Sequence, residues 1–340
     1  MFRKLRPAII WGLVFLAGCG QHGEQGGSVI RAGHFPDIVH SQALVGRARG
    51  EFEKALVTDV KIDWKMFNAG PSAIEALFAG ELDLCYIGPN PAINGYVKSR
   101  GEALRIVAGA ASGGAGMVVR EDSGIKSIAD LHGKRIATPQ LGNTQDVACR
   151  AWLRQNGFRS AEVGGDVSVV PVRNADQLTL LLKREIDGAW TKEPWVARLI
   201  KQGGGRLFLD EKEIWEGGRF VTAHLIASTK FLDEHPDLAK KWLEAHVEIT
   251  LWINANLEEA RQIVSAQVAA ITGKALPEDV LKDAYSRTTI TYDPVRSSLL
   301  KSAHWAFEAG YLREKPDLSG IYDLELLNAV LSEKGLEPIT

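Results

Sequence analysis

Short apolar stretches alternate with helical patterns along most of this chain, and this alternation constrains the fold more than any other feature. The alternation begins at about residue 28 and continues to about residue 190. Such an order is typical of parallel sheets that carry helices on their faces. After about Phe231 the sequence has a helical pattern throughout. We therefore expect an α/β fold that ends in a run of helices.

Two of the apolar strands run directly into polar loops that contain glycine. The strand predicted over Leu82–Ile87 leads into the Gly88–Pro91 loop, and the strand predicted over Leu104–Ala110 leads into the Ser112–Gly114 loop. In an open α/β sheet, ligands bind outside the carboxyl ends of the strands. Glycine lets the backbone approach a ligand closely, and successive exposed N–H groups can bind an anion. The two loops therefore predict two walls of one small-molecule pocket.

The start of the chain has the layout of a secretory signal. A positive segment, Arg3–Arg6, precedes an apolar run over Ala8–Ala17, and Cys19 follows that run. The run is far shorter than the roughly 20 residues that a membrane helix needs. The four residues that end at Cys19 resemble a bacterial lipobox, which implies cleavage before Cys19 and lipidation of its thiol. An ordinary signal peptide with an unrelated cysteine is the alternative.

The composition limits the classes of partner and of chemistry. The net charge of −2 and the pI near 6.5 give no basic excess of the kind that nucleic-acid binding requires. After the signal, only Cys85 and Cys149 remain. Two cysteines in an exported protein could pair, but we expect two separate, buried thiols. No Cys/His spacing suits zinc, and we expect no metal and no cofactor.

The length after the signal is sufficient for two domains. The middle of the chain, 117–218, has its own alternation of strands and helices, and the segments on either side of it form one lobe in our interpretation. The chain would therefore cross between two lobes twice, with Gly113–Gly116 and Gly217–Gly218 as candidate hinges. The predicted divisions are a signal peptide (1–18), a lipidated Cys and flexible tether (19–27), lobe 1 (28–116), lobe 2 (117–218), and a return to lobe 1 with the C-terminal helices (219–340).

A series of short stretches matches, in the expected order, one known family. The stretches are Gly33–Leu44, Ala76–Asp83, Gly88–Pro91, Ser112–Gly114, Ile128–Lys134, Leu141–Thr144, Asp187–Trp190 and Gly218–Leu225. They resemble the substrate-binding proteins of ABC importers, in the group that includes the nitrate, taurine and aliphatic-sulfonate binders. The resemblance covers about residues 28–310 and implies a type II periplasmic-binding-protein fold with two lobes. In that fold each lobe is a mixed, mostly parallel sheet flanked by helices, and two crossover hinges join the lobes.

The resemblance also implies a function. A small organic anion, most simply an aliphatic sulfonate, would bind between lobes that close on it, and the closed form would dock on a membrane permease with its ATPase. The protein would be an exported monomer without enzymatic activity, anchored to the membrane by the lipid on Cys19 alone. Nitrate, bicarbonate, or a heterocycle of the pyrimidine or thiamine-precursor kind are alternative ligands. An enzyme on the same fold and a ligand-sensing partner of a membrane receptor are alternatives from other classes.

The polar loops at the strand ends supply the candidate anion site. Ser112 offers a hydroxyl, and Gly113 and Gly114 offer backbone N–H donors. Thr144 and Gln145 lie at the predicted start of a helix, where free N–H groups and the helix dipole favour an anion. This pattern predicts recognition of an anion without a fixed countercharge. The alternatives are a tight connection without a ligand for the Ser112 loop and a simple N-cap for Thr144.

Aromatic and amide side chains near the same strand ends complete the prediction. Phe35 is placed to pack on the carbon portion of a ligand and Trp190 to stack on it, although either residue could instead lie in a core. Asn90 can donate and accept hydrogen bonds, while His34 and His224 belong either to the cleft or to the surrounding backbone. The predicted ligand-binding residues are His34, Phe35, Pro36, Asn90, Ser112, Gly113, Gly114, Thr144, Gln145, Trp190 and His224.

Two acidic residues beside these stretches are predicted to have other roles. We expect Asp37 to cap the start of a helix. We expect Glu193 to face solvent just before Pro194, although a taurine-like ligand would give it an amine to neutralise.

Overall fold

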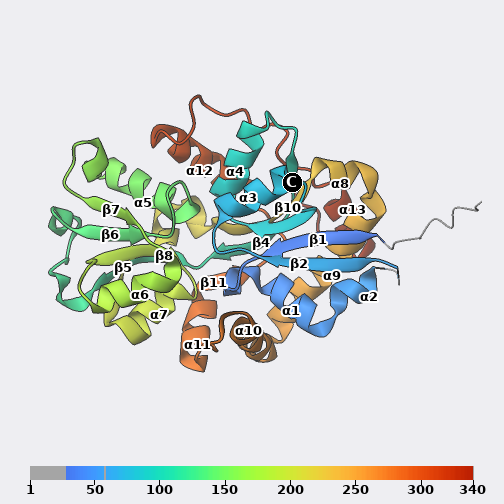
Figure 1. Ribbon diagram of the computed structural model, residues 1–340, viewed down its shortest axis with the longest axis horizontal. Coiled ribbons are helices and arrows are strands. Elements are labelled where there is room, and N and C mark those ends of the chain that lie inside the picture. Colours follow the sequence, from blue (N-terminus) through green and yellow to red (C-terminus); the bar gives the residue numbers. More distant parts are fainter. Residues whose placement is uncertain (1–27, 57–58, 340) are drawn as a thin grey trace, which may run out of the picture.

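The computed structural model of the protein describes residues 28–56 and 59–339. These residues form two α/β lobes, each built around one sheet (Figure 1). The predicted signal peptide, tether and lipidation at Cys19 lie outside the described residues. Within the described ranges, none of the helices combines the length and the apolar character that crossing a bilayer requires.

The sheet of lobe 1 is mixed and has the strand order β11-β4-β10-β3-β1-β2. Its strands are β1 (Val29–His34), β2 (Lys61–Met66), β3 (Leu84–Ile87), β4 (Leu104–Gly113), β10 (Val221–Ser228) and β11 (Thr288–Ile290). β1 pairs in parallel with β2 and β3, whereas β10 runs antiparallel between β3 and β4. The returning strand β10 therefore lies in the middle of a sheet that the first part of the chain begins.

The sheet of lobe 2 is also mixed and has the order β7-β6-β8-β5-β9. Its strands are β5 (Ala115–Arg120), β6 (Arg135–Thr138), β7 (Ser168–Pro171), β8 (Gly188–Lys192) and β9 (Gly205–Asp210). β6 pairs in parallel with β7 and β8, and β5 runs antiparallel between β8 and β9. Two mixed sheets in two lobes confirm the predicted fold class.

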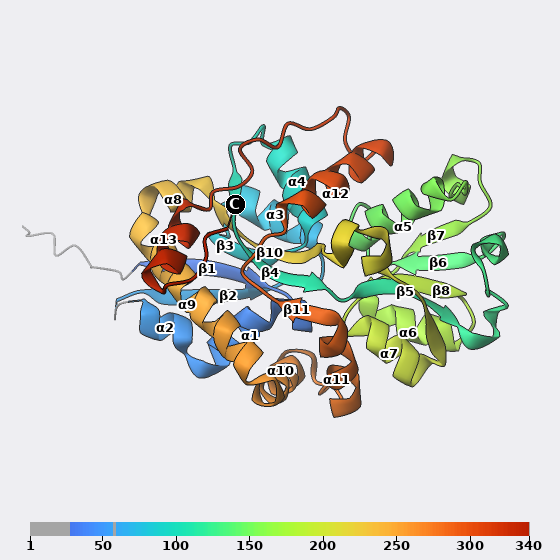
Figure 2. The same cartoon turned by 180° about the vertical axis from the view of Figure 1, so that it is seen from behind.

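Helices flank both sheets (Figures 1 and 2). Lobe 1 contains α1 (Ser41–Arg49), α2 (Glu51–Ala55), α3 (Gly70–Phe78), α4 (Pro89–Lys98), α8 (Thr229–Glu234), α9 (Pro236–Ala255), α10 (Leu257–Thr272), α11 (Glu278–Arg287), α12 (Arg296–Glu308) and α13 (Glu325–Glu333). Lobe 2 contains α5 (Thr144–Gln155), α6 (Asn174–Leu182) and α7 (Trp195–Gly203). Short 3₁₀ turns lie at Ile38–His40, Glu121–Ser123, Ile128–Leu131, Ala161–Val163, Glu211–Ile214 and Glu216–Gly218.

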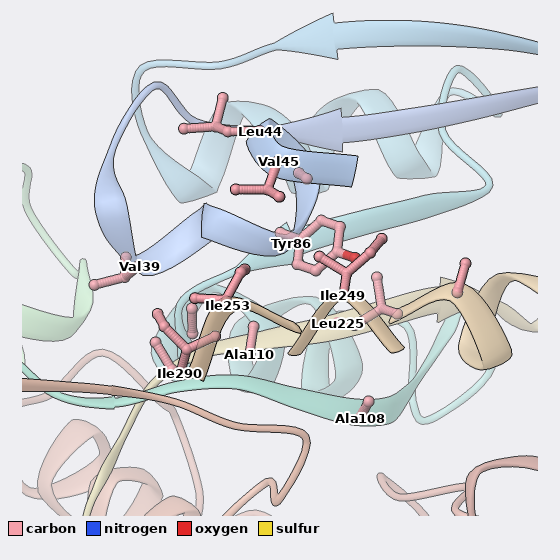
Figure 3. Close-up of a cluster of buried hydrophobic side chains, with 14 of the residues drawn as sticks. Val39, Leu44, Val45, Tyr86, Ala108, Ala110, Leu225, Ile249, Ile253 and Ile290 are labelled. Atoms are coloured by element: carbon pink, nitrogen blue, oxygen red, sulfur yellow. The ribbon is translucent and has the colours of Figure 1, made fainter. Parts of the chain in front are cut away.

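The core of lobe 1 lies between its sheet and helices α1 and α9 (Figure 3). Leu44 and Val45 of α1 and Ile249 and Ile253 of α9 are buried against side chains of the sheet, among them Tyr86. Each large apolar side chain buried in this way contributes about 1.5–3 kcal/mol. This packing holds the sheet, and therefore the strand ends that face lobe 2, in fixed positions.

The chain passes between the lobes twice, and glycines with positive φ lie at both crossings. Gly113 ends β4 with φ of 76°, and Gly114 precedes β5 with φ of 68°. Gly217 and Gly218 precede β10 with φ of 62° and 69°. Residues other than glycine adopt this left-handed region only with strain. These positions support the hinge proposal for both glycine pairs.

The helical prediction for the end of the chain was wrong at β11. Thr288–Ile290 forms a short strand that pairs antiparallel with the end of β4 (Figure 2). These residues are β-branched and therefore suit a strand, but three residues give too short a pattern to detect in a helical region. The Gly88–Pro91 loop also differs from expectation, because α4 begins at Pro89.

Candidate ligand-binding cleft

A cavity of about 740 Å³ lies between the two lobes. Lobe 1 lines it with the loops that follow β1, β2 and β3, with β10, and with the connection between α10 and α11. Lobe 2 lines it with the segments that begin α5, α6 and α7 and with the end of β8. Pockets for small molecules have volumes of roughly 300–1,000 Å³ and bury most of the surface of the ligand, and this cavity lies within that range.

Several helices begin at this cavity and point their N-termini toward it. The cavity lining includes Gly70 at the start of α3, the N-cap residues Gly88 of α4 and Asn143 of α5, Arg173 before α6 and Pro194 before α7. The first turns of α3, α4 and α7 contain no acidic residue. The helix dipoles and the unpaired N–H groups of α3 therefore favour an anion here, whereas the carboxylate of Glu193 already accepts an N–H at the start of α7.

Proline and glycine explain why α3 and α4 start where they do. Pro71 and Pro89 lie in the first turns of these helices, where the absent N–H is not needed and the fixed φ is already helical. No side chain at the N-cap of α3 bonds to that helix, so its first N–H groups remain available at the cavity. In α4, Pro89 and Pro91 have no N–H and the Asn90 N–H donates to Thr144 Oγ1, so the first turn of α4 leaves no free donor.

Cationic side chains line the cavity as well, which differs from the predicted recognition without a fixed countercharge. Among the described residues the lining contains Arg173, Lys192, Arg198 and Lys274 but only one carboxylate, that of Asp37. Lys192 Nζ lies 2.8 Å from Asp37 Oδ2 and 5.5 Å from the centre of the Phe35 ring. The Asp37 side chain forms no helix cap, so its predicted capping role was wrong and it instead forms an ion pair between the lobes.

Thr144 and Gln145 line the cavity at the start of α5. Thr144 Oγ1 accepts a hydrogen bond of 3.4 Å from the Asn90 N–H at the start of α4. A Cβ added to Gly88 would lie only 2.7 Å from the same oxygen. The two helix starts therefore approach each other directly across the cleft.

Phe35 and Pro36 also line the cavity, whereas His34 does not. Phe35 is 6% exposed and its ring packs edge-on against His40 at 4.8 Å, so it belongs to both the core and the cleft wall. His34 is fully buried beside Trp64, and burial lowers its pKa to about 4. His40, which the sequence analysis missed, lines the cavity, and its Nδ1 accepts the Phe35 N–H at 3.1 Å.

The predicted residues Asn90, Ser112, Gly113 and Gly114 lie outside the cavity lining. Asn90 is fully buried and its Oδ1 accepts a 2.7 Å hydrogen bond from Ser302, which ties α4 to α12. Ser112 Oγ donates to the carbonyl of Phe220 at 2.8 Å. β4 continues through Gly113 as a paired strand. Pairing within the sheet therefore occupies backbone groups that the sequence analysis assigned to ligand binding.

Trp190 and His224 are also fully buried and lie outside the cavity lining. Trp190 Nε1 donates to Glu211 Oε2 at 2.7 Å within the core of lobe 2. His224 Nε2 donates to the carbonyl of Pro294 at 3.0 Å, and burial lowers the pKa of this imidazole to about 4. The partners of Trp190 Nε1 and His224 Nε2 are protein atoms, which agrees with the core alternative that the sequence left open, but His224 Nδ1 is buried without a hydrogen-bond partner among the described residues.

Glu193 does not face solvent, and that prediction was wrong. Its carboxylate is buried between the lobes, where Oε1 accepts from Arg287 Nε at 2.7 Å and Oε2 accepts the Ala197 N–H at 3.0 Å. Burial, opposed by Arg287, raises the pKa of Glu193 to about 7. Glu193 and Arg287 therefore form a second polar contact between the lobes.

The remaining chemistry of the described residues is sparse. Cys85 and Cys149 are separate, buried thiols, as predicted, and burial raises the pKa of both. Across the part of the chain that the structure describes, no group of three or more His, Cys, Asp or Glu side chains is arranged to hold a metal ion.

A comparison with known protein families identifies the family of this chain. The NMT1-like family matches residues 26–269, more than half of the chain. The chain belongs to the NMT1-like family.

Two curated relatives show what this family member is similar to. A Bacillus subtilis protein, provisionally named an aliphatic sulfonates-binding protein, is 24% identical over 94% of this chain and 95% of its own length. The taurine-binding periplasmic protein of Escherichia coli is 23% identical over 79% of this chain and 83% of its own length. The similarity to both relatives extends over most of each chain.

Solved structures show that the fold is shared. The alkanesulfonate-binding protein of Xanthomonas axonopodis, bound to MOPS, has a TM-score of 0.71 at 19% identity and covers 87% of this chain and 98% of its own. The periplasmic nitrate-binding protein of Synechocystis has a TM-score of 0.76 at 16% identity, with coverages of 90% and 89%. A DszB mutant in complex with biphenyl-2-sulfinic acid has a TM-score of 0.63 at 16% identity, with coverages of 90% and 99%. The two-lobed fold is therefore common to proteins with different ligands.

Proposed function

We propose that this protein is the extracytoplasmic solute-binding component of an ABC importer and captures an organic anion, most simply an aliphatic sulfonate, between its lobes. The convergence of helix N-termini on an interlobe cavity with an excess of cationic side chains carries this proposal. The curated relatives named for sulfonates and taurine support the same ligand class.

Binding would be coupled to movement of the lobes. Ligand contacts made by both lobes at once favour the closed arrangement, because a ligand shifts a conformational equilibrium by its difference in affinity for the two states. The pairs Lys192–Asp37 and Glu193–Arg287 are the polar contacts that would form on closure. The closed protein would deliver its ligand to a permease and its ATPase as a monomer, held at the membrane by lipid on Cys19.

Two other ligand classes are less well supported by the cavity. Nitrate or bicarbonate would fill a small part of about 740 Å³. A neutral heterocycle would leave the excess of positive charge in the cavity without a partner. An enzymatic role also has little support, since burial raises the pKa of the Cys85 and Cys149 thiols and both lie outside the cavity lining.

A thermal-shift screen tests the proposal. Ethanesulfonate, taurine, longer alkanesulfonates, nitrate, bicarbonate and a pyrimidine would be compared, since a ligand that binds only the folded state stabilises it by about 2.7 kcal/mol at a hundredfold excess over Kd. We expect at least one sulfonate to raise the melting temperature. Stabilisation by the pyrimidine alone, or by none of these anions, would contradict the proposal.

A pair of charge variants on α5 locates the site. Gln145→Glu places a carboxylate among the cavity-lining residues, whereas Gln155→Glu places one at the exposed opposite end of the same helix. We expect the first variant to weaken sulfonate binding at least tenfold and the second to leave it unchanged. Equal affinities for the two variants would show that the anion does not bind at the start of α5.

A further inference from the structure

The cavity is larger than a two-carbon sulfonate requires, and its outer part has a distinct chemistry. Beyond the starts of α4 and α5 the lining continues along α7, with Trp195, Arg198 and Gln202, and faces the connection between α10 and α11. Helices α7 and α11 pack against each other near the lower edge of Figure 1. The cavity lining includes residues of α7 and of the segment that precedes α11.

Arg198 is the unusual group in this outer part. Its guanidinium lies 4.4 Å above the Trp195 ring, and its Nε donates to Gln202 Oε1 at 3.1 Å. The guanidinium is partly buried but forms no ion pair with any carboxylate of residues 28–56 and 59–339. Among the described residues the terminal nitrogens have no hydrogen-bond acceptor, and they are not enclosed by protein, so an anion that enters the cavity can reach both of them.

The surroundings of Arg198 fix what kind of partner fits. The cavity lining contains Lys274 on the connection between α10 and α11 as a second cation, beside the apolar side chains of Leu276 and Pro277. Among the described residues, Lys274 also has no ion pair to a carboxylate. A planar guanidinium binds a carboxylate or a second sulfonate through two parallel hydrogen bonds. Burial also lowers the pKa of Arg198, which is consistent with a cation that lacks an anionic partner.

We infer that the ligand is an elongated organic dianion that binds through one acidic group at the start of α5, through its carbon body along Trp195, and through its second acidic group at Arg198. This inference rests on the proposed function and specifies its ligand class. Arg198 is then a specificity-determining residue that separates such dianions from simple alkanesulfonates.

Two matched pairs of ligands test the inference by isothermal titration calorimetry. Para-sulfobenzoate is compared with benzenesulfonate, and sulfohexanoate with hexanesulfonate, so that two distances between the acidic groups are covered. In at least one pair we expect the dianion to bind ten or more times as tightly as the monoanion. That advantage should disappear in Arg198→Gln and persist in part in Arg198→Lys.

Lys201→Gln provides the matched control, because Lys201 is an exposed cation on the same helix outside the cavity lining. This variant should keep the full preference for the dianion. Melting temperatures without ligand report whether each variant is folded, and if Arg198→Gln is not, the wild-type pairs and Arg198→Lys decide the question.

The outcomes separate this inference from the proposed function. Monoanions and dianions that bind the wild-type protein equally well, or a preference that survives Arg198→Gln, would overturn the dianion inference and leave sulfonate binding intact. The absence of binding by every sulfonate would overturn both.

Discussion

A close approach of the two lobes, between Gly88 and Thr144, gives a direct test of lobe closure. The backbone of Gly88, with φ of −71° and ψ of 158°, accepts alanine without strain. The added Cβ would nevertheless lie 2.7 Å from Thr144 Oγ1, whereas its next neighbours would be at 3.7 and 3.8 Å. Because an ordinary contact begins at 3.4 Å, the closed lobes must move apart by about 0.7 Å or displace the threonine.

We expect Gly88→Ala to penalise the closed state and leave the open, unliganded protein unaffected. Overpacking of this kind costs about 1–3 kcal/mol, which corresponds to a Kd that is roughly 5- to 150-fold weaker. Titration calorimetry with the most stabilising sulfonate of the screen measures the change. The melting temperature without ligand should change little.

A double-mutant cycle isolates the clash from any other effect of the alanine. Thr144→Ala removes the oxygen at 2.7 Å and leaves the Thr222 carbonyl oxygen at 3.7 Å and the Cβ of residue 144 at 3.8 Å, both at ordinary contact distances. In the Thr144→Ala background, Gly88→Ala should therefore have almost no further effect on Kd. A Kd for Gly88→Ala within twofold of wild type, or an equal loss in both backgrounds, would refute the argument that these lobes close against each other.

Three further predictions concern stability. Burial raises the pKa of Glu211 to about 7 from an ordinary 4.5. The stability that this carboxyl contributes is therefore complete below about pH 4.5, and about 3 kcal/mol of it at most is lost as the pH rises through 7. The free energy of unfolding of Glu211→Gln should depend less on pH across this range than that of the wild type. Trp190→Phe removes the indole donor to Glu211 and should lower the free energy of unfolding by about 1–3 kcal/mol without changing ligand affinity; a large loss of affinity would return Trp190 to the site. Gly114→Ala meets both a φ of 68° and Thr288 Oγ1 at 2.2 Å, whereas Gly124→Ala meets a φ of 77° in open space; urea denaturation should show the larger loss for Gly114→Ala, and equal losses would contradict a steric constraint at this crossing.

The sequence predicted those parts of the cleft that depend on local order along the chain. Phe35 and Pro36 follow a strand, and Thr144 and Gln145 begin a helix, so their positions at one edge of a sheet follow from pattern alone. All four residues line the cavity. Whether they contact a ligand is the question that the binding experiments address.

The sequence could not show where a strand stops or what a polar side chain meets far along the chain. The apolar pattern of β4 fades before Gly113, yet the strand continues because β10 and β11 pair with it. β8 likewise extends past Trp190 to Lys192, which places the cation rather than the indole at the cleft. Glu193 appeared to be a surface residue because its partner, Arg287, is 94 positions away.

The central position of β10 in the sheet of lobe 1 has a consequence for synthesis of the protein. β10 pairs with β4, and Phe220, the residue before β10, accepts a hydrogen bond from Ser112 of β4, 108 positions away. The strands of lobe 2 all lie within the segment between these two residues. Closing a long loop is entropically costly and slow compared with forming nearby contacts. As the chain leaves the ribosome or the export channel, lobe 2 can therefore complete its sheet first. In lobe 1, the edge of β4 stays unpaired until the segment that contains β10 has been made and can pair with it.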